Sequence, residues 1–276
     1  KSPWFSICEE ETKGCEDVSL IQGLSQRDQR DLYEIGVKTV NQLAKTELSR
    51  LQEGLEGWNY DKLIRVRNQA EVLVSGKPLI TQHYNFPEVK TEVYFDVESD
   101  PTRGIDCLLG LLIKKGKKTE FKYFLAKGKE EEKKIWEDFL EFFGELEDFV
   151  IYHYGYYEKH VLQRFEKRYG APSDLMKKFR ENSLDLYNIV NSSVIMPVYF
   201  YSLKDIAGFI GYKWLAPGAG GGEPLTWYDQ WLETGKKEFL EKLVRYNEDD
   251  VRATMMVKEW LEKQKPKIQK ETLPEE

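Results

Sequence analysis

The sequence predicts an α/β fold, in which a mixed five-stranded sheet is flanked by helices and follows a small all-α domain. Three observations lead to this prediction. Apolar and polar residues alternate in successive segments that short turn-like sequences separate, which is typical of a meander of strands. Helical and strand-like patterns then take turns, which favours parallel placement of the later strands. The region before them shows helical periodicity alone.

The larger predicted domain covers residues 91–264 and opens with the meander. A helix with one apolar side follows the meander, and a short apolar strand comes next. Since the helix brings the chain back along the sheet, we expect this fourth strand to lie parallel beside the first. The predicted strands are 91–98, 105–114, 119–126, 149–152 and 183–186, and the predicted helices are 130–143, 156–169 and 237–263, with others starting near 186 and 201.

The small helical domain is predicted over residues 19–80. Short helical stretches lead to a longer helix at 61–74, which carries an apolar stripe and ends at Gly76-Lys77-Pro78. The remaining segments have no clear periodicity. They are a remnant of a preceding domain or a tether at 1–18, a linker at 81–90 and a polar tail at 265–276.

Composition limits the class of protein. The chain has 276 residues, 41% hydrophobic residues and a net charge of −7, which indicates a packed globular protein and disfavours a uniformly basic nucleic-acid binder. A local basic groove remains compatible with that charge. No apolar run of roughly 18 residues and no signal peptide are present, so we expect a cytoplasmic location. The first residue, Lys1, suggests a piece of a longer protein, and Cys107 is interpreted as a small buried apolar residue.

Two acidic residues in the first predicted strand begin a candidate metal site. Because side chains alternate along a strand, Asp96 and Glu98 share one face. The apolar residues Val93, Phe95 and Val97 share the other face. Two carboxylates about 7 Å apart on a rigid backbone provide half a site for a hard divalent cation. Acids that face water on an amphipathic strand give the same pattern, so the remaining ligands must come from elsewhere in the chain.

Two predicted helices each place a further acid on their inward side. Glu158 lies on the apolar stripe of its helix, next to Val161. Asp250 lies on the apolar stripe of the last helix, one turn after Tyr246. An inward acid is costly unless it is paired or binds a cation. Two other interpretations stay open: Glu158 as a wet acid favoured by the helix dipole, and Asp250 as the partner of a neighbouring Arg or Lys.

The four carboxylates fit a site for two Mg²⁺ or Mn²⁺ ions. Two such ions can hydrolyse a phosphodiester bond, because one activates the attacking water and the other stabilises the leaving oxygen. Zinc and covalent catalysis fit less well, since the histidines are only His83, His153 and His160 and no Ser or Cys lies in a nucleophile turn. Asp185 is more simply the N-cap of a helix.

A glycine-rich segment at 218–222 is expected to be a flexible loop, and it has no predicted phosphate-binding role because it follows no strand and lacks the Lys-Ser/Thr ending of a phosphate-binding loop. Aromatic residues flank this segment. We interpret them as core and lid packing, with base stacking as the alternative. They are Trp214, Trp227, Tyr228 and Trp231.

Three segments of the chain resemble the motifs of the DEDD 3′-to-5′ exonucleases of the ribonuclease H-like superfamily. Phe95-Asp96-Val97-Glu98 matches the first motif. Residues 151–158 match the second in spacing, with His153 where Asn is usual and Glu158 where Asp is usual. Residues 246–251 match the third in its tyrosine form, DEDDy, since Tyr246 lies four before Asp250.

The N-terminal region carries two more resemblances. Residues 20–44 are similar to a helix-hairpin-helix element, whose hairpin offers backbone N–H groups to a phosphate, with Ser25 where a second Gly often lies. Residues 3–8 resemble the end of the cysteine cluster of RecB-type nucleases. In combination the chain looks most like the YprB-type exonuclease domain of larger nucleases. The hairpin candidates for nucleic-acid binding are Gly23, Ser25 and Lys38, and a purely structural hairpin remains the alternative.

The resemblance implies a ribonuclease H-like fold, a role for each acid and a substrate. Asp96 would bridge two metal ions, Glu98 and Asp250 would hold the first, Glu158 would hold the second, and Tyr246 would orient the attacking water. The implied activity is 3′-to-5′ hydrolysis of single-stranded nucleic acid, DNA more than RNA. An inactive nucleic-acid-binding module of a larger nuclease or helicase protein is the alternative function. The motifs do not determine whether the substrate is DNA or RNA, what the oligomeric state is, or which domain lies upstream.

Overall fold

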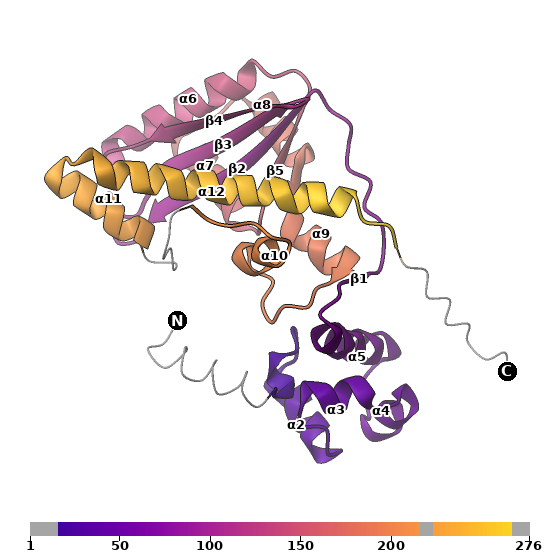
Figure 1. Cartoon of the computed structure of the whole chain (residues 1–276). Helices are drawn as coiled ribbons and strands as arrows, with labels where there is room; N and C mark the ends of the chain where they lie inside the picture. Colours follow the sequence, from indigo (N-terminus) through magenta and orange to yellow (C-terminus); the bar gives the residue numbers. More distant parts are fainter. Residues whose placement is uncertain (1–15, 216–222, 267–276) are drawn as a thin grey trace. The chain divides into compact units, whose positions relative to one another are not determined.

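A computed structural model of the chain describes residues 16–215 and 223–266 (Figure 1). The chain divides into two compact units. Among the described residues, the helical unit contains 16–83, Val190–Ile206 and 264–266. The sheet unit contains Tyr84–Ile189 and Ala207–Lys263.

The helical unit is built from short capped helices around its own apolar core. Side chains of Ser25, Thr39 and Asn59 each accept a backbone N–H at the start of a helix, which satisfies groups that the helix leaves unpaired. Leu32, Leu43 and Leu63 are among the buried core residues. The elements are η1 (Val18–Leu20), α2 (Gln26–Glu34), α3 (Val40–Lys45), α4 (Leu48–Gly54) and α5 (Tyr60–Ser75).

A later segment of the chain completes the helical unit. Strand β1 (Leu79–Ile80) pairs antiparallel with β7 (Val194–Ile195). The side chain of Gln69 in α5 donates to the carbonyl of Met196 at 2.9 Å, and the hydroxyl of Tyr201 donates to Gln69 at 3.1 Å. The sequence analysis placed this segment in the larger domain, because hydrogen bonds between distant residues leave no periodic pattern in a sequence. The predicted domain boundaries stay a prediction.

The sheet unit contains the predicted mixed sheet, with the strand order β4-β3-β2-β5-β6. Strand β2 pairs antiparallel with β3 and parallel with β5, as predicted for the first and fourth strands. Strand β4 extends the antiparallel side and β6 the parallel side. The strands are β2 (Thr91–Asp100), β3 (Ile105–Lys115), β4 (Lys118–Leu125), β5 (Phe149–His153) and β6 (Ser183–Asp185).

Helices cover both faces of this sheet, which confirms the predicted α/β class (Figure 1). Helices α8 and α11 had not been predicted. In α8 only Met176 and Phe179 are buried, so its apolar stripe is too short to recognise in the sequence. The helices are η2 (Lys129–Glu131), α6 (Glu132–Gly144), α7 (Tyr157–Tyr169), α8 (Ser173–Glu181), α9 (Leu186–Ser193), α10 (Leu203–Phe209), α11 (Glu223–Thr234) and α12 (Lys237–Glu262).

The two faces of β2 have different neighbours. Val93 and Phe95 belong to the apolar core with residues of α6 and α7, such as Phe139. The opposite face is crossed by α12 (Figure 1). There Asp96 pairs in register with Gly110 of β3, and a Cβ atom added to Gly110 would lie only 1.5 Å from Oδ1 of Asn247. The missing side chain at Gly110 therefore lets α12 lie directly on the sheet, next to Asp96.

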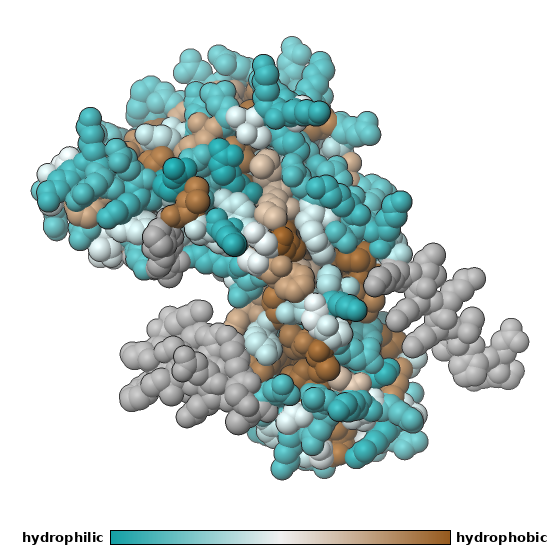
Figure 2. Space-filling model, in the orientation of Figure 1, coloured by the Kyte–Doolittle hydropathy of each residue, from teal (hydrophilic) through white to brown (hydrophobic). Residues whose placement is uncertain are grey.

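The face of the sheet unit that is visible in Figure 2 is mainly hydrophilic. Hydrophilic residues cover most of this face, with apolar residues in small separate patches. Among the described residues, no helix combines the length and the apolar character needed to cross a membrane. The buried Cys107 agrees with its interpretation as a small core residue, and Cys8 and Cys15 lie outside the described residues.

Candidate metal centre

Three predicted metal ligands meet between the sheet and α12. Asp96 and Glu98 extend from β2 on the face that α12 covers, and Asp250 comes from α12 itself. Each of the three offers a carboxylate oxygen, and these atoms lie within 4.8 Å of one another. Carboxylate oxygens are the ligands that Mg²⁺, Mn²⁺ and Ca²⁺ prefer. The geometry therefore suits a hard divalent cation.

The electrostatics of Asp96 show the cost of this arrangement without a cation. Burial and the neighbouring carboxylates of Glu98, Asp250 and Glu158 raise the pKa of Asp96 well above its ordinary value. Negative charges that lie this close destabilise one another in a partly buried site. A divalent cation at this position removes the repulsion, so the residues fit a metal ion.

Glu158 lies near the three acids but not within their group. It starts α7, is 5% exposed, and has its Oε2 atom buried with no hydrogen-bond partner among the described residues. Burial, with smaller contributions from Asp185 and Asp250, raises the pKa of Glu158 to about 8. The inward orientation excludes the wet-acid interpretation. The structure brings Asp96, Glu98 and Asp250 together, and it places Glu158 near enough for its charge to act on Asp96.

The turn before Glu158 is held by two neighbouring residues. His153 is 1% exposed, and its Nδ1 atom lies 2.6 Å from the carbonyl oxygen of Gly155. Burial lowers the pKa of His153 to about 4, so the ring is neutral at pH 7 and Nδ1 carries the donated proton. Asp185 accepts the backbone N–H of Gly155 at 2.8 Å and that of Tyr187 at 2.9 Å. Asp185 therefore caps α9, as predicted, and also fixes this turn.

Tyr246 lies one helical turn before Asp250, and its phenol is hydrogen-bonded to the Asp250 carboxylate. Burial and the charges of Asp250, Glu98 and Asp96 raise the pKa of Tyr246 above its ordinary value. The phenol therefore keeps its proton at neutral pH and acts as a hydrogen-bond donor beside the acids. The position agrees with the spacing in the sequence, while a catalytic role stays a prediction.

The sequence analysis missed Asn247 beside the acids, and it gave Trp214 only a packing or base-stacking role. Asn247 has no exposed surface and donates through Nδ2 to Oδ2 of Asp96 at 2.7 Å. Trp214 donates through Nε1 to Oδ1 of Asp250 at 2.7 Å. Asn247 lies three residues before Asp250 on the same inward stripe, so the helical period could have identified it. Trp214 lies in an irregular segment, where no period exists.

The acid next to Asp250 has a different task. Asp249 is 1% exposed, accepts the hydroxyl of Tyr212 at 3.0 Å, and accepts the backbone N–H of Leu215 at 2.9 Å. These bonds attach the segment after α10 to α12. The segment then brings the Nε1 atom of Trp214 to the Asp250 carboxylate, while metal binding by Asp250 stays a prediction.

The other predicted aromatic residues mostly serve the core. Tyr228 is buried, and Trp227 and Trp231 pack against the core as partly buried residues, which supports the packing interpretation for all three. The predicted flexible loop at 218–222 lies outside the described residues.

The predicted phosphate-binding residues belong to the helical unit. Gly23, Ser25 and Lys38 are all exposed. The Ser25 hydroxyl accepts the backbone N–H of Asp28 at 3.2 Å, and the Ser25 N–H donates to the Asp28 carboxylate at 3.0 Å. Ser25 is thus the cap of α2, which gives it a structural task. Phosphate binding by these residues stays a prediction.

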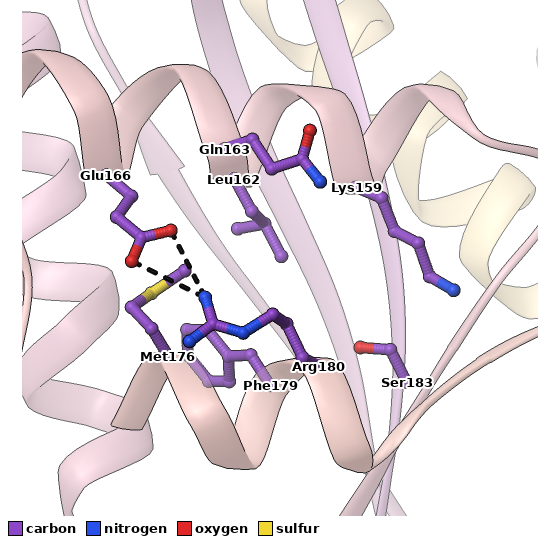
Figure 3. A pocket seen from close by; sticks show the side chains of 8 residues that line it. All are labelled: Lys159, Leu162, Gln163, Glu166, Met176, Phe179, Arg180 and Ser183. Atoms are coloured by element: carbon purple, nitrogen blue, oxygen red, sulfur yellow. Dashed lines mark hydrogen bonds and ion pairs between the residues drawn. The ribbon is translucent and has the colours of Figure 1, made fainter. Parts of the chain in front are cut away.

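A pocket of about 120 Å³ lies between α7 and α8, apart from the acids (Figure 3). Its floor is apolar, and its rim carries charges. Arg180 is paired with Glu166 at 3.4 Å, and Figure 3 shows Lys159 extending towards Ser183 at the other end of the pocket. The lining residues are Lys159, Leu162, Gln163, Glu166, Met176, Phe179, Arg180 and Ser183. None of them belongs to the group of three acids.

The comparisons with known proteins give one match. A family model described as the RNase H superfamily matches residues 93–262, which include the five strands of the mixed sheet apart from the first residues of β2, together with all of α12. No curated protein and no solved structure matches the chain.

Proposed function

Because the chain belongs to the RNase H superfamily, we propose that it is a divalent-metal-dependent nuclease that removes nucleotides 3′ to 5′ from single-stranded nucleic acid, DNA more than RNA. One observation carries the proposal. The carboxylates of Asp96, Glu98 and Asp250 lie within 4.8 Å of one another, between a rigid strand and the helix that crosses it. Such a group is the part of a nuclease that holds the metal during phosphodiester hydrolysis.

Four acidic residues would hold two Mg²⁺ or Mn²⁺ ions. Asp96, Glu98 and Asp250 would hold one ion, and Asp96 and Glu158 would hold the other, with Glu158 offering the oxygen that has no hydrogen-bond partner among the described residues. The bound ions supply activation of the attacking water and stabilisation of the leaving oxygen. Asn247 restrains one oxygen of Asp96, which leaves the other oxygen for a cation.

Tyr246 acts on the attacking water. Its phenol stays protonated, because burial and the surrounding carboxylates raise its pKa, so it can donate a hydrogen bond beside Asp250. This arrangement corresponds to the DEDDy type, and the chain as a whole to the YprB type of exonuclease domain. In the proposal, the helix-hairpin-helix segment binds the strand backbone through Gly23, Ser25 and Lys38, within a larger cytoplasmic protein.

A second candidate is a nucleic-acid-binding module without nuclease activity. One observation favours it: Glu158 lies outside the group of three acids within 4.8 Å. With one weak ligand the second ion would be poorly held, and a two-ion reaction would be slow. Binding without degradation is what this alternative predicts.

A degradation assay separates the two candidates. An oligonucleotide labelled at its 3′ end is incubated with Mn²⁺, with Mg²⁺ or with a chelator, and release of the labelled mononucleotide is measured. We expect release with either metal and none with the chelator. The variants Asp96→Asn and Asp250→Asn should lose it, whereas Asp174→Asn, which changes an exposed acid of the same unit, should keep it. A wild-type protein that binds the strand and degrades it with neither metal is the alternative module.

A further inference from the structure

The turn between β5 and α7 exposes a large aromatic side chain. Tyr156 is 70% exposed, the highest fraction of any large apolar or aromatic side chain in the described part of the chain. Most tyrosine rings pack against apolar surface, so a ring that is this exposed contributes little to folding. Its sequence neighbour two positions on, Glu158, is 5% exposed and faces inward. One short segment therefore presents an acid to the interior and a ring to solvent.

More aromatic side chains gather around this turn. The rings of Tyr156 and His160 are 5.2 Å apart, and those of Tyr154 and Tyr187 are 5.9 Å apart. Tyr187 is 37% exposed and His160 is also exposed. Tyr154 and Tyr156 lie in the turn after β5, His160 lies in α7 and Tyr187 in α9, so this turn carries two ring pairs rather than a single exposed residue.

The aromatic surface is held rigidly. Gly155 has a φ of +98°, a value that lets the chain turn sharply between Tyr154 and Tyr156. The Gly155 N–H is bound by Asp185 at 2.8 Å, and its carbonyl is bound by His153 at 2.6 Å. A preorganised aromatic surface loses little conformational entropy when a ligand binds.

The first turn of α7 also carries a cation. Lys159 follows Glu158 directly, and its charge acts on His153. Aromatic rings for the bases and a lysine for the phosphates are the two components by which proteins hold single-stranded nucleic acid without reading its sequence. A protein partner would use the rings but would have no need of a phosphate-binding lysine.

We propose that Tyr156, with Tyr154, His160 and Tyr187 around it, is a platform on which the bases of a single strand stack near the acids. This inference rests on the proposed nuclease function and adds a subsite to it. A strand whose phosphate reaches Glu158 has its adjoining bases next to the turn that carries Tyr156. Stacking tolerates any base, so the platform holds the strand without sequence preference.

The test measures base stacking separately from cleavage. A single strand carrying the fluorescent base 2-aminopurine is titrated with the full chain in a chelator, so that no degradation occurs. We expect strong quenching of the base on binding. Tyr156→Ala should remove most of the quenching and weaken binding about tenfold, and Tyr156→Phe should keep both within about twofold of the wild type.

Two controls make the result specific. Tyr123→Ala removes a 41% exposed ring from the edge strand β4, and it should behave as the wild type. A strand with abasic sites should bind the wild type and Tyr156→Ala equally. The proposal is overturned if Tyr156→Ala binds and quenches as Tyr123→Ala does, or if its defect persists on the abasic strand, which would indicate a protein-binding surface or a folding role.

The failure of this inference differs from the failure of the proposed function. If the wild type degrades the 3′-labelled strand and Tyr156→Ala binds normally, the nuclease proposal is supported and the platform proposal is rejected. If the wild type quenches the fluorescence of the base but never degrades a strand, the platform proposal is supported and the nuclease proposal is rejected.

Discussion

Asn247 shows how one buried amide prepares an acid for metal binding. Its Nδ2 atom holds Oδ2 of Asp96, and the amide is itself held between α12 and Gly110 of β3. The Oδ1 atom of Asn247 is buried with no partner among the described residues, which is unfavourable for stability. A side chain that costs stability and touches a candidate ligand is typical of a functional site.

The first prediction concerns this amide. Replacing Asn247 by Ala should slow degradation roughly tenfold or more, because a hydrogen bond to a charged group contributes about 1.5–3 kcal/mol. Mn²⁺ affinity, measured by calorimetry, should fall as well. Asn188→Ala, which removes an exposed amide bound to Asp185, is the matched control and should keep the wild-type rate. A normal rate and a normal Mn²⁺ affinity in Asn247→Ala would show that the amide has only a packing role.

At the residue level the sequence predicted the acidic residues better than the residues that donate hydrogen bonds to them. Spacing on strands and helices identified Asp96, Glu98 and Asp250, because the periods of secondary structure determine which face a side chain occupies. It also placed Glu158 inward, but the period cannot state how far a carboxylate reaches, and Glu158 lies outside the group of three. The contact of Trp214 depends on an irregular segment, which has no period at all.

At the level of elements, the site depends on how closely α12 approaches the sheet. A strand interior usually gains from a side chain, and Gly110 lies in the middle of β3 with apolar residues on both sides. The added Cβ would lie 1.5 Å from Oδ1 and 2.6 Å from Cγ of Asn247. The glycine is therefore needed for the contact between helix and sheet rather than for a backbone turn.

The second prediction tests this contact. Gly110→Ala should lower the free energy of unfolding by about 3 kcal/mol, because a buried clash forces α12 away from the sheet. Gly144→Ala is the control: a Cβ there meets nothing within 4 Å, and the change should be within about 0.5 kcal/mol of the wild type. Urea unfolding measures both. Adding Asn247→Ala to Gly110→Ala should recover part of the loss, and a lack of recovery would mean that the clash lies elsewhere.

The elements themselves were largely predictable. The five strands of the sheet and the long last helix were found within a few residues of their ends, since strand and helix periods survive in long segments. Helices α8 and α11 were missed, because few of their residues are buried. The register that places Gly110 opposite Asp96 could not be predicted, because register depends on pairing between strands rather than on either strand alone.

At the level of the whole molecule, a buried ionic cluster ties α6 to α7 and β3 within the sheet unit. The Glu132 side chain has no exposed surface, and its Oε1 atom accepts the Asp106 N–H at 3.0 Å and the Lys129 ammonium at 2.9 Å. Arg168 and Tyr169 of α7 donate to its other oxygen. Burial alone would raise the pKa of Glu132, but these hydrogen bonds hold it below its ordinary value.

The third prediction follows from the sign of this shift. A carboxylate whose pKa is lower in the folded state stabilises the protein above its unfolded pKa of about 4.5, and this stability is lost as the pH falls through the lower folded pKa. Glu132→Gln should therefore cost about 3 kcal/mol at pH 7 and progressively less below about pH 4.5.

The measurement is urea unfolding of the wild type and Glu132→Gln across this pH range. Taking the difference between the two proteins cancels the opposite contribution of Glu158, whose raised pKa makes the protein less stable as the pH rises. Glu137→Gln changes an exposed glutamate of the same helix and should show no such pH dependence. A difference that stays constant with pH would contradict the ionic role of Glu132.

The close contact between Gly110 and Asn247 also limits which residues can occupy these two positions in related sequences. A mutation that gave position 110 a side chain would expel the amide, and a mutation that enlarged position 247 would strike the backbone of β3. A side chain at position 110 therefore requires a smaller residue at position 247. Among relatives of this chain, a side chain at position 110 should mark those in which the partner of Asp96 has been replaced, and with it the means of holding that acid.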